Sequence, residues 1–178
     1  TMKTIVKLLM SAAIVVGLAT AIVSCKKDEQ TGKMTVKMTD APADYLAVNV
    51  EIIGLNVNVD GHGWVNVPCK PGIYNLLELQ NNATVVLADD VTLPTGNISQ
   101  LRLVLGSNNS VQTISGTFDL KVPSGEQSGL KINIHQTIEG DKLLVMVLDF
   151  DANASVVSTN EGGYNLKPVI KLKSAVHI

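Results

Sequence analysis

Residues 143–150 have the sequence LLVMVLDF, in which the first six residues are all apolar. Side chains along a β-strand point to opposite faces in turn, so a strand that is apolar at both odd and even positions is covered on each side. The stretch therefore predicts a central strand of a sheet. The polar residues Asp151 and Asn153 follow it and favour a turn.

Other stretches on both sides of this strand alternate apolar and polar residues, which is typical of strands with one face in water. They lie at residues 34–38, 48–52, 55–59, 101–105, 118–122 and 130–134. The apolar positions change parity at Ile53-Gly54, which predicts a β-bulge there. Residues 164–173 contain Pro168 and three lysines, and they predict an edge strand.

The spacing of these patterns predicts the fold class. No stretch after residue 24 keeps a helical period for three turns, although residues 74–83 are compatible with one short helix. Strand patterns recur about every 8 to 12 residues, with turn residues between them. We therefore expect an all-β fold over residues 33–178: a single antiparallel β-sandwich of about 7–9 strands, immunoglobulin-like or transthyretin-like, after an N-terminal signal helix.

The composition narrows the classes of function. The chain has 178 residues, a formal net charge of −2 and 3% aromatic residues. A mildly acidic chain offers no electrostatic surface for nucleic acid, so no nucleic-acid partner is expected. Few aromatic residues, no nucleophile–base pair and no zinc-protease motif predict that the protein is not an enzyme.

Residues 1–24 have the pattern of a secretion signal. Lys3 and Lys7 precede an uncharged run over residues 8–23, and small residues gather toward its end. The run is shorter than the ~20 apolar residues that a membrane-spanning helix needs. We expect this segment to be removed.

The end of that segment, IVSC at residues 22–25, resembles the lipobox of bacterial lipoproteins, with Ile22 in place of the commoner leucine. The resemblance implies that Cys25 is lipidated, that residues 25–32 form a polar tether and that the protein is anchored to the outer membrane. The sequence KKDE at residues 26–29 resembles a surface-export tag, which implies exposure on the cell surface. Lipidation of Cys25 would leave Cys69 without a disulfide partner.

Several short motifs carry a second resemblance. They are TDAP at 39–42, LRL at 101–103, PSG at 123–125, GLK at 129–131, DFDA at 149–152 and LKPV at 166–169. In this order, over residues 33 to about 173, they resemble domain-of-unknown-function family DUF4382. The resemblance implies a secreted, often lipid-anchored β-sandwich, and it supplies no activity and no functional residues.

Arg102 is the only arginine in the chain and lies among leucines in the middle of a predicted strand. A guanidinium in such a place needs a partner. Asp149 and Asp151 share one face of their strand, so we expect a structural ion pair between Arg102 and one of them, or Asp40.

The same carboxylates suggest a metal site. Asp40, Asp149, Asp151 and Asn153 carry oxygens of the kind that calcium prefers, although no EF-hand spacing is present. Turn formation is the alternative role for these residues, and it is the favoured one. No other cofactor is expected.

The scarce aromatic residues suggest a binding surface. Trp64, Tyr45, Tyr74 and Tyr164 can present stacking faces at strand ends, with core packing as the alternative, which is favoured for Trp64. We expect a lipid-anchored surface module that binds or adheres to an unknown protein or glycan without catalysis. The alternatives are a structural accessory subunit of an outer-membrane assembly and a calcium-stabilised glycan-binding domain.

Overall fold

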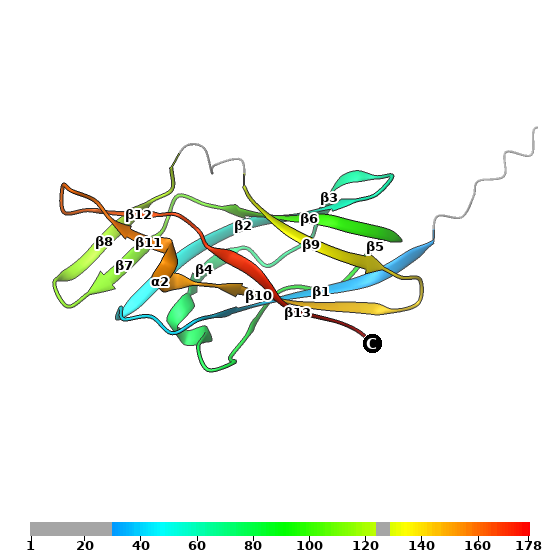
Figure 1. The fold of residues 1–178 in the computed structure, drawn as a ribbon, viewed down its shortest axis with the longest axis horizontal. Coiled ribbons are helices and arrows are strands. Elements are labelled where there is room, and N and C mark those ends of the chain that lie inside the picture. The colour runs from blue at the N-terminus through cyan, green and yellow to red at the C-terminus, as the bar shows by residue number, and fades with distance from the viewer. Residues whose placement is uncertain (1–29, 124–128) are drawn as a thin grey trace, which may run out of the picture.

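The computed structural model describes residues 30–123 and 129–178 (Figure 1). The predicted signal peptide, residues 1–24, and Cys25 lie outside the described residues. The described part of the chain is mostly β, with thirteen strands in two sheets. The first strand begins at Thr31, inside the segment predicted as a tether.

The smaller sheet has four strands. They are β1 (Thr31–Asp40), β5 (Val85–Pro94), β10 (Leu143–Phe150) and β13 (Ile170–His177), in the order β13-β10-β1-β5. The stretch 143–150 therefore lies inside a sheet, as its sequence predicts. Only one of its faces is fully buried: Leu148 is 0% exposed, whereas Val145 is partly exposed. The other face was predicted to be covered as well. Val145 lies on that face between Thr35 of β1 and Val176 of β13, and these two neighbours shield it only in part.

The larger sheet is built along its longest strand, β2 (Ala47–Val59). Its other strands are β3 (Gly63–Val67), β4 (Gly72–Asn75), β6 (Gly96–Leu105), β7 (Ser110–Thr113), β8 (Gly116–Lys121), β9 (Leu130–Ile138), β11 (Val156–Ser158) and β12 (Tyr164–Leu166). The pairing registers place β6 and β7 on one side of β2, and β3 and β4 on the other. β2 thus organises the whole sheet.

The predicted β-bulge in β2 is confirmed. The register between β2 and β6 shifts between Ile52 and Gly54. The extra residue, Ile53, is 52% exposed. The bulge returns Leu55 to the buried face, which explains why the apolar positions change parity in the sequence.

Two features of the predicted sandwich are wrong. The sheets are mixed, because β1 pairs with β10 and β12 pairs with β8 in parallel. Alternation of apolar residues is the same in parallel and antiparallel strands, so it does not reveal direction. The strands also exceed the predicted 7–9, because some single patterns are divided by loops.

The predicted edge strand over residues 164–173 is one such divided pattern. It splits into β12 in the larger sheet and β13 at the edge of the smaller sheet. Pro168 lies in the crossing between them, where it has no ladder hydrogen bond to donate. The predicted short helix is a single 3-10 turn, η2 (Leu76–Leu79), and a second short helix, α2 (Ala152–Ser155), follows β10.

The inner faces of both sheets contribute to one hydrophobic core. Its fully buried members include Met34, Val36, Met38, Leu144, Met146 and Leu148 from the smaller sheet and Val48, Val50, Ile52, Leu55, Val57, Ile98, Leu101 and Leu103 from the larger one. Along one side the sheets are linked by His177 of β13, whose Nε2 lies 2.7 Å from the carbonyl oxygen of Thr137 in β9.

Candidate functional site

The outer face of the larger sheet carries the only tryptophan of the chain. Trp64 lies on β3, directly after a tight turn at residues 60–63, and it is 36% exposed. Because side chains alternate along a strand, Val65 and Val67 face the core while Trp64 and Asn66 face outward. The prediction that favoured core packing for Trp64 is therefore wrong.

Arg102 stacks on this tryptophan. Its Cζ atom lies 4.0 Å from the centroid of the Trp64 ring, well within the range of a cation–π interaction. β6 supplies Arg102 and β3 supplies Trp64, and β2 lies between these two strands. The guanidinium therefore reaches across β2 on the outer surface of the sheet.

The predicted ion pair between Arg102 and Asp149, Asp151 or Asp40 is not formed. Within residues 30–123 and 129–178, no carboxylate lies within 4.0 Å of Arg102. Asp149 belongs to the other sheet and pairs with Lys171, with 3.2 Å between Oδ2 and Nζ. Arg102 points outward from its own sheet, so it cannot reach a carboxylate of the other sheet across the core.

Gly129 provides space for the arginine. An added Cβ at Gly129 would lie 2.7 Å from Cγ and 2.8 Å from Cδ of Arg102, and Gly129 has a φ of +95°. Both observations require glycine at this position. The Nε atom of Arg102 is buried and has no hydrogen-bond acceptor among the described residues. Trp64 therefore packs on the guanidinium, and Gly129 leaves room for the aliphatic part of the Arg102 side chain.

Polar side chains surround this pair in two rows that cross four strands. In each row, every residue is the cross-strand partner of the next. One row consists of Trp64, Asn58, Gln100 and Asn133, and the other of Asn66, Asn56, Arg102 and Lys131. We call these eight residues the Trp64 face. Five of them are amides, and each amide can both donate and accept hydrogen bonds. The side chain of Gln100 donates to that of Asn133 at 3.0 Å.

The three tyrosines predicted as ligand platforms do not belong to this face. The hydroxyl of Tyr74 donates to the carbonyl of Lys70 at 2.6 Å. The ring of Tyr164 packs against Phe118, with 5.2 Å between centroids. Tyr45 is half-buried against the core. Burial raises the pKa of Tyr45 and of Tyr74, as expected for rings that pack inside.

Three of the four candidate calcium ligands are already engaged in a hydrogen bond or an ion pair. Asp40 is buried, its Oδ1 accepts from the Ala152 amide at 2.9 Å, and burial raises its pKa to about 6. Asp151 caps α2 by accepting from the Ala154 amide at 2.8 Å. Asn153 is exposed. The described parts of the chain contain no group of three or more His, Cys, Asp and Glu side chains arranged to hold a metal.

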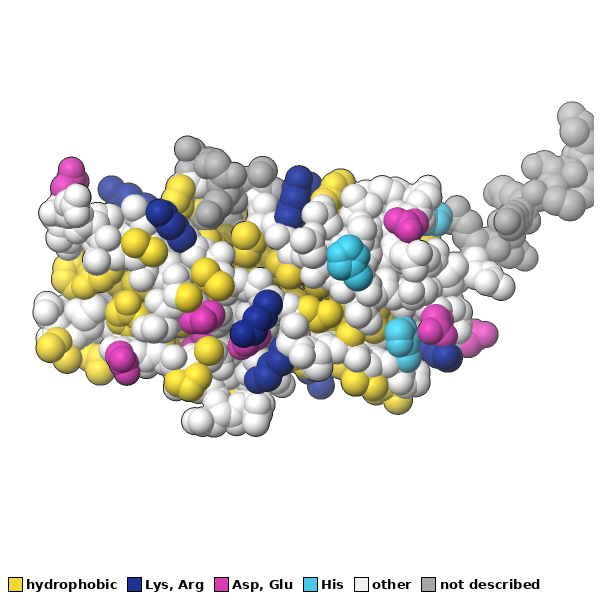
Figure 2. Space-filling view, in the orientation of Figure 1, with side chains coloured by type: hydrophobic (Ala, Val, Ile, Leu, Met, Phe, Trp, Pro, Cys, Tyr) yellow, Lys and Arg dark blue, Asp and Glu magenta, His cyan; other side chains and the backbone are white. Residues whose placement is uncertain are grey.

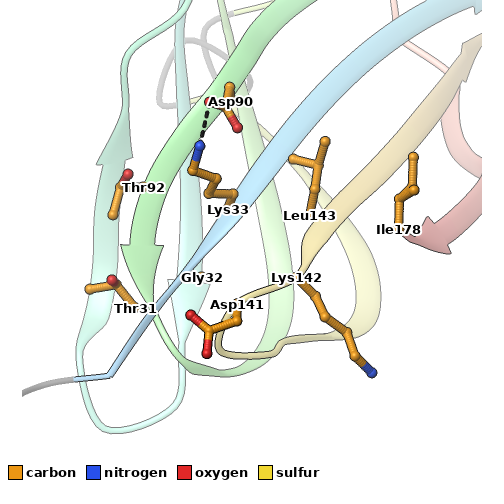
Figure 3. Close-up of a pocket in the computed structure, with 9 residues that line it drawn as sticks. All are labelled: Thr31, Gly32, Lys33, Asp90, Thr92, Asp141, Lys142, Leu143 and Ile178. Atoms are coloured by element: carbon orange, nitrogen blue, oxygen red, sulfur yellow. Dashed lines mark hydrogen bonds and ion pairs between the residues drawn. The ribbon is translucent and has the colours of Figure 1, made fainter.

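A pocket of about 530 Å³ lies where β1 and β10 begin (Figure 3). Lys33 turns toward Asp90 in this pocket and pairs with it at 2.6 Å, whereas the side chain of Lys142 points away. The ammonium of Lys33 is therefore already neutralised by a neighbour. This arrangement offers little to bind a charged ligand.

A larger depression of about 840 Å³ lies beside the loop at residues 106–109. The loop is held firmly, because the Asn109 side chain accepts from the Glu51 amide and donates to the Gly106 carbonyl, both at 2.8 Å. Ile53 and Leu105 contribute apolar walls.

Figure 2 shows charged side chains in small separate groups over the viewed face of the molecule.

The sequence predicted Trp64 and Arg102 as separate candidates and missed the residues around them. The signal was the series of amides at outward positions, such as Asn56 and Asn58 in β2 and Asn66 in β3.

Among the described residues, no helix is long and apolar enough to cross a membrane.

Comparison with known proteins adds one match. Neither a curated protein nor a solved structure matches the chain. The family model described as "Domain of unknown function (DUF4382)" matches residues 31–168. The match begins with β1, includes Trp64, Arg102 and Gly129, and ends in the crossing between β12 and β13. The chain therefore belongs to the DUF4382 family.

Proposed function

We propose that the protein is a lipid-anchored, non-catalytic module of the cell surface that binds a glycan through the Trp64 face. The observation that carries this proposal is an exposed tryptophan next to five amide side chains on one outer sheet face. An indole ring stacks on the apolar face of a sugar ring, and amides pair with its hydroxyl groups.

The scaffold supports binding because it is rigid. The Trp64 face is spread over β3, β2, β6 and β9, whose backbones are joined by ladder hydrogen bonds. A site on paired strands is already ordered before the ligand arrives, so little conformational entropy is lost on binding. Two sheets around one core suit a β-sandwich of the immunoglobulin-like or transthyretin-like type.

The anchor rests on the sequence. Residues 22–25 resemble a lipobox, and lipidation at Cys25 would attach the protein to the outer membrane a few residues before β1 begins at Thr31. The segment at residues 26–29 supports display on the outer surface. A lipid anchor outside the cell suits a protein that captures polymers.

A glycan array tests the binding function. The protein, purified in its mature lipidated form in detergent, is expected to bind at least one class of glycan, and Trp64→Ala is expected to lose that binding. Ile114→Ala is the matched control, because Ile114 is 96% exposed in the turn between β7 and β8. Equal binding by Trp64→Ala and the wild type would refute the assignment of the site.

A structural accessory role is the alternative, and one observation favours it. The outer face of the smaller sheet exposes Val176 to 58% and leaves Val145 partly exposed beside it. Val176→Lys would disrupt an apolar contact with a second outer-membrane protein. A smaller assembly on native gels for this variant, with glycan binding unchanged, would support the accessory role. The calcium-stabilised alternative has less support, because the carboxylates that would bind the metal already serve other contacts.

A further inference from the structure

The Trp64 face carries a net positive charge, in contrast to the chain as a whole. Arg102 and Lys131 are directly opposite each other across β6 and β9, and the face has no carboxylate among its eight residues. The whole chain has a net charge of −2. Like charges in directly opposed positions destabilise a sheet. An anion bound between Arg102 and Lys131 would relieve that repulsion.

The contacts of Arg102 prepare it to bind a carboxylate. The Trp64 ring packs on the guanidinium, Gly129 leaves room for Cγ and Cδ of the arginine, and the buried Nε is shielded from water. A packed guanidinium loses little freedom on binding, and its remaining N–H groups form the fork that matches the two oxygens of a carboxylate. Loss of water around the group strengthens its attraction for an anion.

We infer that the ligand is an acidic glycan, whose carboxylate groups pair with Arg102 and Lys131 while a neighbouring sugar ring stacks on Trp64. This inference rests on the glycan-binding function proposed above. Trp64 on β3 and Lys131 on β9 are three strand spacings apart, which is about 14 Å at the usual spacing of about 4.8 Å. A short oligosaccharide spans such a surface.

An acidic peptide would also satisfy the two cations. The rest of the face favours the glycan, because five amides and an indole fit repeated hydroxyl groups and sugar rings. An acidic peptide has carboxylates but few hydroxyl groups to pair with the row formed by Asn58, Gln100 and Asn133. Polyglutamate therefore serves as the probe for the peptide class.

The experiment is calorimetric titration of the mature lipidated protein in detergent with polygalacturonate, alginate and hyaluronan. Each polymer is paired with its carboxyl-reduced form, which keeps the linkages and loses the charge. We expect at least one acidic polymer to bind and its reduced form to bind at least tenfold more weakly. Raised salt should weaken binding of the acidic polymer and leave the reduced form unaffected.

Substitutions locate the effect on the face. Arg102→Gln and Lys131→Gln should each weaken binding of the acidic polymer at least fivefold, and Lys121→Gln, on β8 outside the face, should not. Lys131 is exposed, so Lys131→Gln should keep its melting temperature even if Arg102→Gln unfolds.

The outcomes separate the two proposals. Equal affinity for acidic and reduced polymers, or binding of a neutral glycan alone, overturns the acidic ligand and leaves glycan binding in place. Binding of polyglutamate as tightly as any of the polysaccharides overturns the glycan in favour of an acidic peptide. Binding of no glycan, neutral or acidic, overturns the function and the inference together.

Discussion

Arg102 and Trp64 each occupy a position that the other makes favourable. An exposed indole presents apolar surface to water, and a half-buried guanidinium loses part of its hydration. Stacking covers one side of the ring and places the positive charge against the negative face of the π-system. The pair is therefore a stable surface feature even without a ligand.

Trp64 is the only tryptophan, so its fluorescence reports on this contact directly. Arg102→Ala should shift the emission maximum to longer wavelength, because water replaces the guanidinium on the ring. The loss of stability should be small, about 0.5–1 kcal/mol in urea unfolding. Lys121→Ala should leave the spectrum unchanged. An unaltered spectrum in Arg102→Ala would mean that the two side chains are not in contact in solution.

Asp40 gives a pH dependence of stability. Burial raises its pKa from 3.8 to about 6. Between these two pH values the folded state therefore keeps the Asp40 proton, which the unfolded state has already released. The stability contributed by the protonated form is therefore complete below pH 3.8 and is lost as the pH rises through about 6.

Asp40→Asn should remove that loss, since the amide oxygen can still accept from the Ala152 amide. The variant should exceed the wild type in unfolding free energy at pH 7 by on the order of 1 kcal/mol and should match it below pH 4. Chemical unfolding at both pH values provides the measurement, with exposed Asp119→Asn as the control. A variant that is less stable than wild type at pH 7 would contradict the prediction.

The composition of the Trp64 face was partly predictable from the sequence. The alternation of apolar and polar residues over 55–59 is enough to place Asn56 and Asn58 on the outward face of their strand. Their alignment with Gln100 and Lys131 was not predictable, because register between distant strands depends on turns and on the bulge at Ile53. The ion pair predicted for Arg102 failed for a related reason: sequence does not tell which sheet a strand joins.

Among the elements, β10 shows how one strand can carry two different environments. Leu148 faces the core and is 0% exposed, whereas Val145 lies on the opposite, partly exposed face. Both residues are apolar in the sequence, and this led to the prediction of a strand covered on each side. Apolar residues at both parities identified an inner strand correctly but overstated the burial of its outer face.

Paired substitutions in β10 measure this difference. Leu148→Ala should cost about 2–5 kcal/mol, because it leaves a cavity in the shared core. Val145→Ala should cost less than about 1 kcal/mol, because that side chain is partly in water. Urea unfolding of both variants provides the values. Similar losses for the two would indicate that the outer face is covered in solution.

Strand direction and strand number mark the limit of prediction from sequence at this scale. The parallel pairing of β1 with β10 joins residues more than 100 positions apart, and no local pattern encodes it. The division at Pro168 was visible as a proline within a predicted strand. Its meaning, a crossing from one sheet to the other, depends on where the core lies.

For the whole molecule, the proposed attachment to the membrane would depend on a single side chain, Cys25. The chain has two cysteines, and Cys69 is half-buried, with a pKa that burial raises. In a host that lipidates such proteins, Cys25→Ser should abolish incorporation of labelled fatty acid and reduce recovery from the outer membrane. Cys69→Ser should retain both. Fatty-acid label on Cys25→Ser would disprove anchoring at Cys25.

The hairpin that carries Trp64 lies at the same end of the molecule as the start of β1 (Figure 1). Two backbone contacts fix this neighbourhood: the Asp60 amide donates to the Asn97 carbonyl, and the Thr95 amide donates to the Gln30 carbonyl, both at 2.9 Å. If the protein is anchored at Cys25, this end of the molecule faces the membrane, and the indole of Trp64 lies near the lipid headgroups. A polymer bound there would lie along the surface of the cell that carries the protein. Such an arrangement would retain a surface layer rather than attach the cell to another one.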